Sequence, residues 1–226
     1  MKKIFVLILA VVALASIGSA GPVTPCGTGT IGFATLVGSG FECEAGDYIF
    51  SNFDVTSGSV DSNVTATIQI SGLQGQIVLF NLNDGNGFTS NFDLTYTVTL
   101  DPTALPASLD PTYYAIVLAT AGLQDNGGDS ATWQKTVDAT SGTGSGSETI
   151  TDANGTTTPS GAITGLAATV LNVTDDFNII SGTNGSIVDL SNRYTEADTL
   201  APEPSTMLLL GGALIGLSVV VRKRRS

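Results

Sequence analysis

The sequence predicts an all-β protein whose body is an antiparallel β-sandwich, jelly-roll-like in arrangement. Apolar and polar residues alternate in several segments, and Gly, Asn, Asp and Ser interrupt the chain between those segments. Strand-favouring Thr, Val, Ile and aromatic residues are frequent. No stretch between residues 21 and 200 keeps the periodicity of a helix. A β-helix is the alternative architecture, but the chain shows no fixed repeat period.

The clearest predicted strand covers residues 92–100, where five apolar side chains fall on one face and Asp and Thr side chains on the other. Residues 64–70 alternate in the same way, and residues 133–137 do so more weakly. Two runs, 77–82 and 113–119, are nearly continuously apolar. Such runs are typical of central strands covered on both faces.

Turn signals lie between these segments. Asn-Gly pairs, which suit the two-residue turn of a β-hairpin, begin at Asn86, Asn126, Asn154 and Asn184. The best hairpin prediction is the pair at Asn184, which has strand-like residues on both sides. Residues 139–161 are rich in Gly, Ser and Thr and are predicted to be a flexible loop inside a single body domain, residues 21–200.

The charge distribution excludes several classes of function. Residues 21–200 hold 19 acidic side chains and 2 basic ones, Lys135 and Arg193. A surface with so few cations cannot neutralise a run of phosphates, so no nucleic-acid partner is expected. The chain has no histidine. Ser-His-Asp and Cys-His enzymes and the usual zinc sites are therefore excluded.

Residues 1–20 have the three parts of a secretory signal peptide: two lysines, an apolar run and a small-residue end. We expect signal peptidase to cleave between Ala20 and Gly21. The alternative is an N-terminal anchor helix, for which the apolar run is short.

Residues 201–226 have three features in order. Pro202, Glu203 and Pro204 come first, followed by an uncharged segment, residues 205–221, that is long enough for a transmembrane helix. A basic cluster completes the tail: Arg222, Lys223, Arg224 and Arg225. The positive-inside rule places this cluster in the cytoplasm and the body on the other side of the membrane.

This order of features resembles the PEP-CTERM sorting signal of Gram-negative bacteria. The resemblance implies that an exosortase recognises the tail, and that the protein is linked to exopolysaccharide, biofilm and the cell surface. The expected route is export through the inner membrane, anchoring by the C-terminal helix, then processing and release to the cell surface or extracellular matrix. The alternative is a plain membrane anchor with a proline-rich hinge.

Cys26 and Cys43 are the only cysteines. Export to an oxidising compartment makes a disulfide the expected state, with a free thiol pair as the alternative. The segment from Cys26 through the Gly-Asp pair and the Phe-rich residues after Cys43 also resembles the start of many PEP-CTERM protein bodies. That resemblance adds weight to a β-rich extracellular body and carries no activity.

We expect no catalytic residues. Glycoside hydrolysis needs two acids, and candidate pairs include Glu42 with Glu44 and Asp175 with Asp176. Asp175 and Asp176 are neighbours on a predicted strand and should point to opposite faces. Trp133, the only tryptophan, is expected in the core; an exposed position, where it would stack on a sugar, is the alternative.

No cofactor or metal site is predicted, with calcium as the alternative. Asn and Asp side chains can supply the oxygen ligands of calcium, but they also stabilise turns without any ion. Two clusters have this composition: Asn81, Asn83, Asp84 and Asn86, and Asp125, Asn126 and Asp129.

Together these observations predict a non-catalytic exported protein of the cell surface or extracellular matrix, associated with exopolysaccharide. The alternative is an adhesin-like or carbohydrate-binding module that uses loop residues, with or without calcium.

Overall fold

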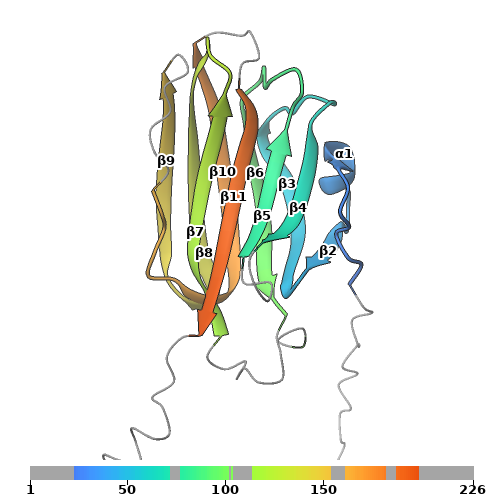
Figure 1. The fold of residues 1–226 in the computed structure, drawn as a ribbon, viewed down its shortest axis with the longest axis vertical. Helices are drawn as coiled ribbons and strands as arrows, with labels where there is room; N and C mark the ends of the chain where they lie inside the picture. Colours follow the sequence, from blue (N-terminus) through green and yellow to red (C-terminus); the bar gives the residue numbers. More distant parts are fainter. Residues whose placement is uncertain are drawn as a thin grey trace, which may run out of the picture.

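The computed structural model describes residues 23–71, 77–101, 103, 114–153, 161–181 and 187–198. These residues form one short helix, α1 (Phe33–Leu36), and a set of strands (Figure 1). The strands are β1 (Ile31–Gly32), β2 (Glu42–Ala45), β3 (Tyr48–Gly58), β4 (Thr65–Ser71), β5 (Ile77–Asn83), β6 (Phe92–Leu100), β7 (Tyr114–Asp125), β8 (Ser130–Thr143), β9 (Ser145–Ala153), β10 (Ala167–Ser181) and β11 (Ile187–Asp198). The all-β prediction is confirmed.

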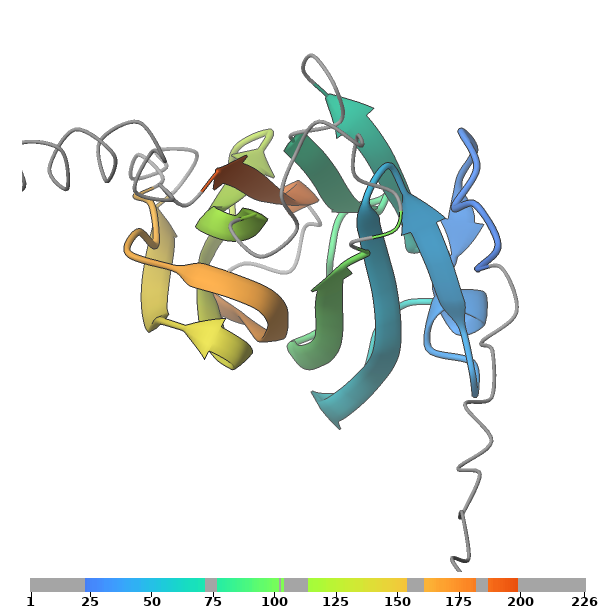
Figure 2. The same cartoon turned by 90° about the horizontal axis from the view of Figure 1, so that it is seen from below.

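All the strands belong to one antiparallel 11-stranded sheet that curls so that its two halves face each other (Figure 2). We call one half the β10 layer; its order is β2-β3-β6-β10-β8-β9. The other half is the β11 layer, with the order β1-β4-β5-β11-β7. One residue pair, Ala168 of β10 with Ile116 of β7, joins the two layers.

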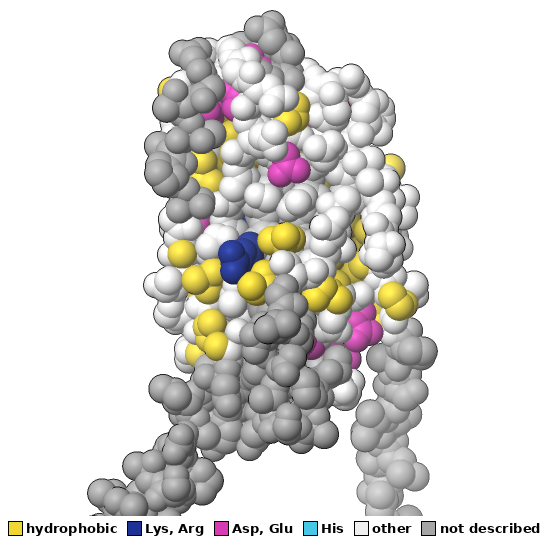
Figure 3. Space-filling model, in the orientation of Figure 1, with side chains coloured by type: hydrophobic (Ala, Val, Ile, Leu, Met, Phe, Trp, Pro, Cys, Tyr) yellow, Lys and Arg dark blue, Asp and Glu magenta, His cyan; other side chains and the backbone are white. Residues whose placement is uncertain are grey.

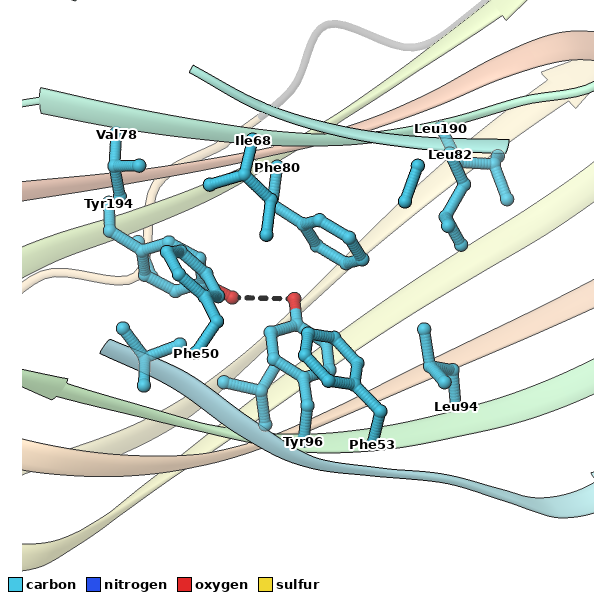
Figure 4. Close-up of a cluster of buried hydrophobic side chains, with 14 of the residues drawn as sticks. Phe50, Phe53, Ile68, Val78, Phe80, Leu82, Leu94, Tyr96, Leu190 and Tyr194 are labelled. Carbon is cyan, nitrogen blue, oxygen red and sulfur yellow. Dashed lines mark hydrogen bonds between the residues drawn. The ribbon is translucent and has the colours of Figure 1, made fainter. Parts of the chain in front are cut away.

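The core fills the space between the layers. On β6 the five apolar side chains predicted to share a face all point inward, and none is more than 3% exposed. Aromatic rings from both layers meet there (Figure 4). Phe53 of β3 stacks on Tyr96 of β6, with ring centroids 5.1 Å apart, and Phe80 of β5 meets the same tyrosine edge-on at 5.1 Å. Trp133 is fully buried, as predicted.

The two continuous apolar runs are not covered on both faces, so that prediction is wrong. On β5, Val78, Phe80 and Leu82 are buried, whereas Ile77 and Leu79 are half-buried. On β7, residues 117 and 118 are likewise half-buried. With two layers, each strand faces the core on one side, and its other apolar residues lie on the outer face.

The segment predicted as a flexible loop, residues 139–161, is mostly strand. Residues 130–138 of β8 pair with residues 145–153 of β9, and Thr143 still pairs with β10. The glycines have another role here. Gly142 has φ 100°, and a Cβ at this position would lie 2.1 Å from the carbonyl oxygen of Ala167. Glycine is therefore required for close strand approach. Residues 154–160 lie outside the described residues.

Three of the four Asn-Gly pairs do not join paired strands. The strands on either side of Asn86, Asn126 and Asn184 belong to opposite layers and do not pair with each other. At Asn86 the connection begins with a local turn, in which the backbone N–H of Asn86 donates to Asp84 Oδ1 at 2.9 Å. Asn154 and Asn184 themselves lie outside the described residues. Where sequence-adjacent strands pair around described turn residues, glycine is present instead, at Gly46 between β2 and β3 and at Gly144 between β8 and β9.

The predicted disulfide joins Cys26 to Cys43, with Cα atoms 4.7 Å apart. It holds the segment before β1 against β2, beside two backbone hydrogen bonds: Cys26 N–H to Glu44 O (2.8 Å) and Glu44 N–H to Thr24 O (2.9 Å). The disulfide and the hydrogen bonds together cover the outer edge of β2.

Replacing both cysteines by serine should lower the free energy of unfolding by about 3 kcal/mol, because the unfolded chain regains the freedom of the closed loop. Urea unfolding of the oxidised proteins measures this difference. Reductant should destabilise the wild type by a similar amount and leave the double variant unchanged. Equal stability of the oxidised wild type and the double variant would contradict the prediction.

Candidate functional site

The residues predicted for processing lie outside the described residues. These are Ala20, Gly21, the Pro-Glu-Pro motif, the helix predicted at 205–221 and the basic tail. Within the part of the chain that the structure describes, no helix is long and apolar enough to cross a membrane. Two arrangements in the body have functional potential: a charged cluster between the layers and a polar outer face.

The charged cluster centres on an ion pair that is closed to solvent. Lys135 of β8 and Asp175 of β10 face each other directly in the register of these neighbouring strands. Lys135 Nζ lies 3.0 Å from Asp175 Oδ1, and the two side chains are 0% and 1% exposed. A buried charge without a partner is strongly destabilising, so each of these residues depends on the other.

Two tyrosines complete the cluster. The ammonium group of Lys135 also donates to the Tyr194 hydroxyl (3.0 Å) and the Tyr96 hydroxyl (3.3 Å). Tyr96 donates its single proton to Asp175 Oδ2 at 3.0 Å. The 2.7 Å contact between the tyrosine oxygens, drawn as a dashed line in Figure 4, therefore has Tyr194 as the donor. All three ammonium hydrogens have acceptors, and both carboxylate oxygens have donors.

Burial shifts the pKa values in this cluster. It lowers the pKa of Lys135, although the charge and hydrogen bond of Asp175, and then the charge of Glu148, act in the opposite direction. Burial, followed by the negative charge of Asp175, raises the pKa of Tyr96 and Tyr194 well above the ordinary 10.0. The phenols therefore keep their protons and act as donors.

Glu148 extends the cluster onto β9, where it stands opposite Lys135 in the strand register. Its side chain points inward and is 9% exposed. One carboxylate oxygen accepts a hydrogen bond from the backbone N–H of Ala121 on β7 (3.3 Å). Burial raises the pKa of Glu148, while the backbone N–H groups of Ala121 and Gly161 and the charge of Lys135 oppose the rise. Asp175, Lys135 and Glu148 thus form one inward row across β10, β8 and β9.

The sequence alone did not predict this row as a site. A signal was present, because Lys135 falls on the same face as Trp133 and Val137 in the alternating segment 133–137. A lysine at an inward position of a strand needs an acidic partner. The sequence could not show which of 19 acids supplies it, because that depends on strand register.

The central part of the outer face of the β10 layer is polar. Fifteen side chains lie in three cross-strand rows, all half-buried or exposed, and none of them is apolar. Read from β9 to β3, the rows are Thr149, Gln134, Asp176, Asp93 and Ser57; Ser147, Thr136, Thr174, Thr95 and Asp54; and Ser145, Asp138, Asn172, Thr97 and Ser51. We call these residues the polar face. Their hydroxyl, amide and carboxylate groups can all hydrogen-bond to a ligand.

One acid pair lies on the polar face. Asp176 and Asp93 are cross-strand partners, and Asn178 donates a hydrogen bond to Asp176. Burial, and then the nearby charge of Asp93, raises the pKa of Asp176. Asp176 points away from Asp175, as predicted for neighbours on a strand. The other predicted pair, Glu42 and Glu44, lies on one face of the short edge strand β2.

A second acid pair connects the two layers. Asp47, in the turn between β2 and β3, is 4% exposed and hydrogen-bonds to Glu196 of β11, which is 3% exposed. Burial raises the pKa of Asp47 above its ordinary 3.8, although the hydrogen bond with Glu196 opposes the rise. The hydrogen bond between these two side chains joins the layers.

The two Asn/Asp clusters proposed for calcium are engaged in turns. Besides the Asp84 turn, Asp125 Oδ1 accepts a hydrogen bond from the backbone N–H of Gly127 at 2.8 Å. Among the described residues, no group of three His, Cys, Asp or Glu side chains is arranged to hold a metal ion. Asn and backbone oxygens are also calcium ligands, so this arrangement does not test the calcium alternative.

Residues 200–225 match the family model of the PEP-CTERM protein-sorting motif. The chain carries a PEP-CTERM sorting motif. The motif implies an exosortase as the processing partner, export, and membrane anchoring before processing.

One solved structure with similarity to the chain is that of TmCBM61 in complex with β-1,4-galactotriose. The match covers 66% of this chain and 89% of that chain, with 14% sequence identity and a TM-score of 0.32. No curated protein matches the chain.

The raised pKa of Asp47 gives a pH prediction. The folded state holds this proton more tightly than the unfolded chain does. The stabilisation is therefore complete below pH 3.8 and is lost as the pH rises through the higher folded pKa. Asp47→Asn cannot ionise, so the wild type should lose stability relative to this variant as the pH rises towards neutral. The loss should be about 1.4 kcal/mol for every pH unit by which the folded pKa exceeds the unfolded one.

Urea unfolding at a series of pH values measures this difference. Asp54→Asn, on the exposed side of β3, controls for the removal of one negative charge. A difference between wild type and Asp47→Asn that stays constant with pH would contradict the prediction.

Proposed function

We propose that this protein is a non-catalytic exported protein that an exosortase sorts through its tail, and that its body associates with exopolysaccharide at the cell surface or in the extracellular matrix. The single observation that carries the proposal is the PEP-CTERM motif at residues 200–225. The motif supports exosortase processing directly. The destination of the protein and the association of its body with polysaccharide are further parts of the proposal.

A non-catalytic role is supported by the positions of the acids. Two-acid hydrolysis requires both carboxyl groups beside a space that a sugar can enter. Asp175 is enclosed in the core, and Asp93 and Asp176 lie on the broad polar face. A cleft of about 660 Å³ runs between the segment after Cys26 and strands β2 and β4, and among its lining residues only Glu44 is acidic.

The second candidate function is direct carbohydrate binding, and the polar face is the observation that favours it. Its side chains offer donors and acceptors at the regular spacings of a sheet, which suits a polymer with repeated hydroxyl groups. Some of these groups already interact sideways: Thr97 Oγ1 donates to Asn172 Oδ1 at 3.4 Å and accepts from Asn52 Nδ2 at 3.3 Å. Under this second candidate function, carbohydrate binding can be tested for dependence on calcium.

Replacing Pro202, Glu203 and Pro204 together by alanine should prevent processing of the tail in the cells that make the protein. Intact mass spectrometry should find the wild type shortened near the motif and the triple variant with its tail retained. Thr199→Ala, just outside the matched residues, is the control and should be processed like the wild type. Identical processing of the triple variant, or an uncut wild type, would refute sorting through this motif.

A matched pair of surface variants tests direct binding. Thr95→Ala/Thr97→Ala/Asn172→Ala removes the centre of the polar face, and Thr65→Ala/Thr67→Ala/Gln69→Ala changes the outer face of the β11 layer. With exopolysaccharide purified from the producing cells, the first variant should bind at least about tenfold more weakly, which is about 1.4 kcal/mol. The second should bind like the wild type.

Two outcomes of this binding assay carry further information. Loss of wild-type binding in EDTA, and its recovery with added calcium, would establish calcium dependence. Equal binding by the two triple variants would exclude the polar face as the contact surface and leave only indirect association with the matrix.

A further inference from the structure

We propose that Lys135 and Asp175 react with each other in the folded protein to form an intramolecular amide (isopeptide) bond between β8 and β10, with Glu148 carrying protons. This modification goes beyond the proposed function and does not depend on it. It rests on the arrangement of the three side chains within one row of the β10 layer.

The reacting groups are already in contact. Lys135 and Asp175 are direct cross-strand partners, and Nζ is 3.0 Å from Oδ1. Paired strands hold the two side chains opposite each other, so little motion is needed to bring the nitrogen onto the carboxyl carbon. Because the two groups are held together, they need not meet by diffusion. This raises the rate of reaction between them by several orders of magnitude.

Burial favours the reactive, neutral form of the Lys135 amine. An ammonium–carboxylate pair in water is unreactive towards amide formation, because the amine has no free lone pair. Burial disfavours the ammonium charge of Lys135 and lowers its pKa. Transfer of one proton from Lys135 to Asp175 across their hydrogen bond gives a neutral amine and a neutral acid, which are the nucleophile and electrophile that the bond requires.

The neighbours are placed to assist. Tyr96 donates to Asp175 Oδ2 at 3.0 Å, so it can stabilise the negative charge that develops on this oxygen when the nitrogen attacks. Glu148 stands opposite Lys135 on the other side, with its pKa raised by burial. A carboxyl with a raised pKa can take a proton from the attacking nitrogen and return it to the leaving oxygen.

The reaction balances without any co-reactant. The bond from Lys135 Nζ to Asp175 Cγ forms, and the bond from Cγ to Oδ1 breaks. Oδ1 leaves as water with two of the three hydrogens of the original ammonium group, and the third stays on the amide nitrogen. Glu148 and Tyr96 end in the protonation states in which they began, and nothing is oxidised or reduced.

The enclosed site also favours the product. Two charges that are costly to bury become one neutral amide, and the released water can leave the dry core. The alternative is a permanent ion pair, in which the same contacts only hold the layers together. The two states differ in mass and in susceptibility to trypsin.

Intact mass spectrometry of the protein purified in its native state from the producing cells, reduced so that the disulfide does not contribute, tests the proposal. We expect a mass lower than that of the same chain without the bond by one water molecule. Lys135 and Arg193 are the only trypsin sites between residues 21 and 200. With the bond in place, trypsin should cut the unfolded protein at Arg193 and not at Lys135. The peptide that ends at Arg193 should then contain both Lys135 and Asp175 and weigh one water molecule less than its sequence predicts.

Three variants make the test specific. Lys135→Arg keeps the charge but should lose no water. Asp175→Asn should release ammonia in place of water and so give a product of the same mass as the wild-type product. Glu148→Gln keeps an acceptor for the Ala121 N–H, and its bond should form at least tenfold more slowly in freshly refolded protein.

The proposal would be overturned if folded wild-type protein, kept for several days at the growth temperature of the producing cells, retains its full mass and is cut at Lys135. The ion pair would then be permanent. Loss of water in Lys135→Arg would overturn it as well, since the bond would lie elsewhere. If Lys135→Arg does not fold, the wild-type mass and the Glu148→Gln time course still decide. None of these outcomes depends on exosortase processing or on polysaccharide binding.

Discussion

The contact on which the rest of the body depends is the enclosed pair of Lys135 and Asp175. Separating these charges inside the core would cost more than most single interactions in a small domain, so every strand around them must keep its register. A shift of one residue on β8 would turn Lys135 to the solvent and leave Asp175 alone. Because the tyrosine partners come from β6 and β11, the pair also fixes the two layers relative to each other. The aromatic core of Figure 4 is thus organised around a polar centre.

The two sides on which the layers meet are closed in different ways. On one side, β7 pairs with β10 through a single residue pair, so most backbone groups along this side of β7 need other partners. Ala119 exchanges two hydrogen bonds with Ile163, and Glu148 accepts the N–H of Ala121. On the other side, the disulfide and the backbone bonds between Thr24, Cys26 and Glu44 cover β2. Glu148 therefore accepts a backbone hydrogen bond from β7 and also belongs to the charged row.

The sequence predicted features that depend on a single strand, such as its inward face. It did not predict features that depend on which strands pair and in what register. Alternation identified β6 and its inward face, and composition identified the buried Trp133 and the disulfide. The Asn-Gly pairs misled because a local turn signal does not say whether the next strand pairs with its neighbour or crosses to the other layer. The glycines of residues 139–161 misled for a similar reason, since Gly142 allows β8 to approach β10 and a composition count cannot show that approach. Predicting the row of Asp175, Lys135 and Glu148 would have required the strand register in addition to the alternation of residues.

The distribution of charge narrows the kind of polymer that the proposed association can involve. Of the two cations in residues 21–200, Lys135 is enclosed with Asp175 and only Arg193 reaches the surface. Arg193 belongs to β11, and Figure 3 shows a single basic patch on this side, among hydrophobic and neutral groups. The polar face, on the opposite side, carries four aspartates and no cation. Such a face repels an anionic polysaccharide at the short range left by physiological salt. A neutral polysaccharide, or an anionic one bridged by calcium, is therefore the chemistry that this surface fits.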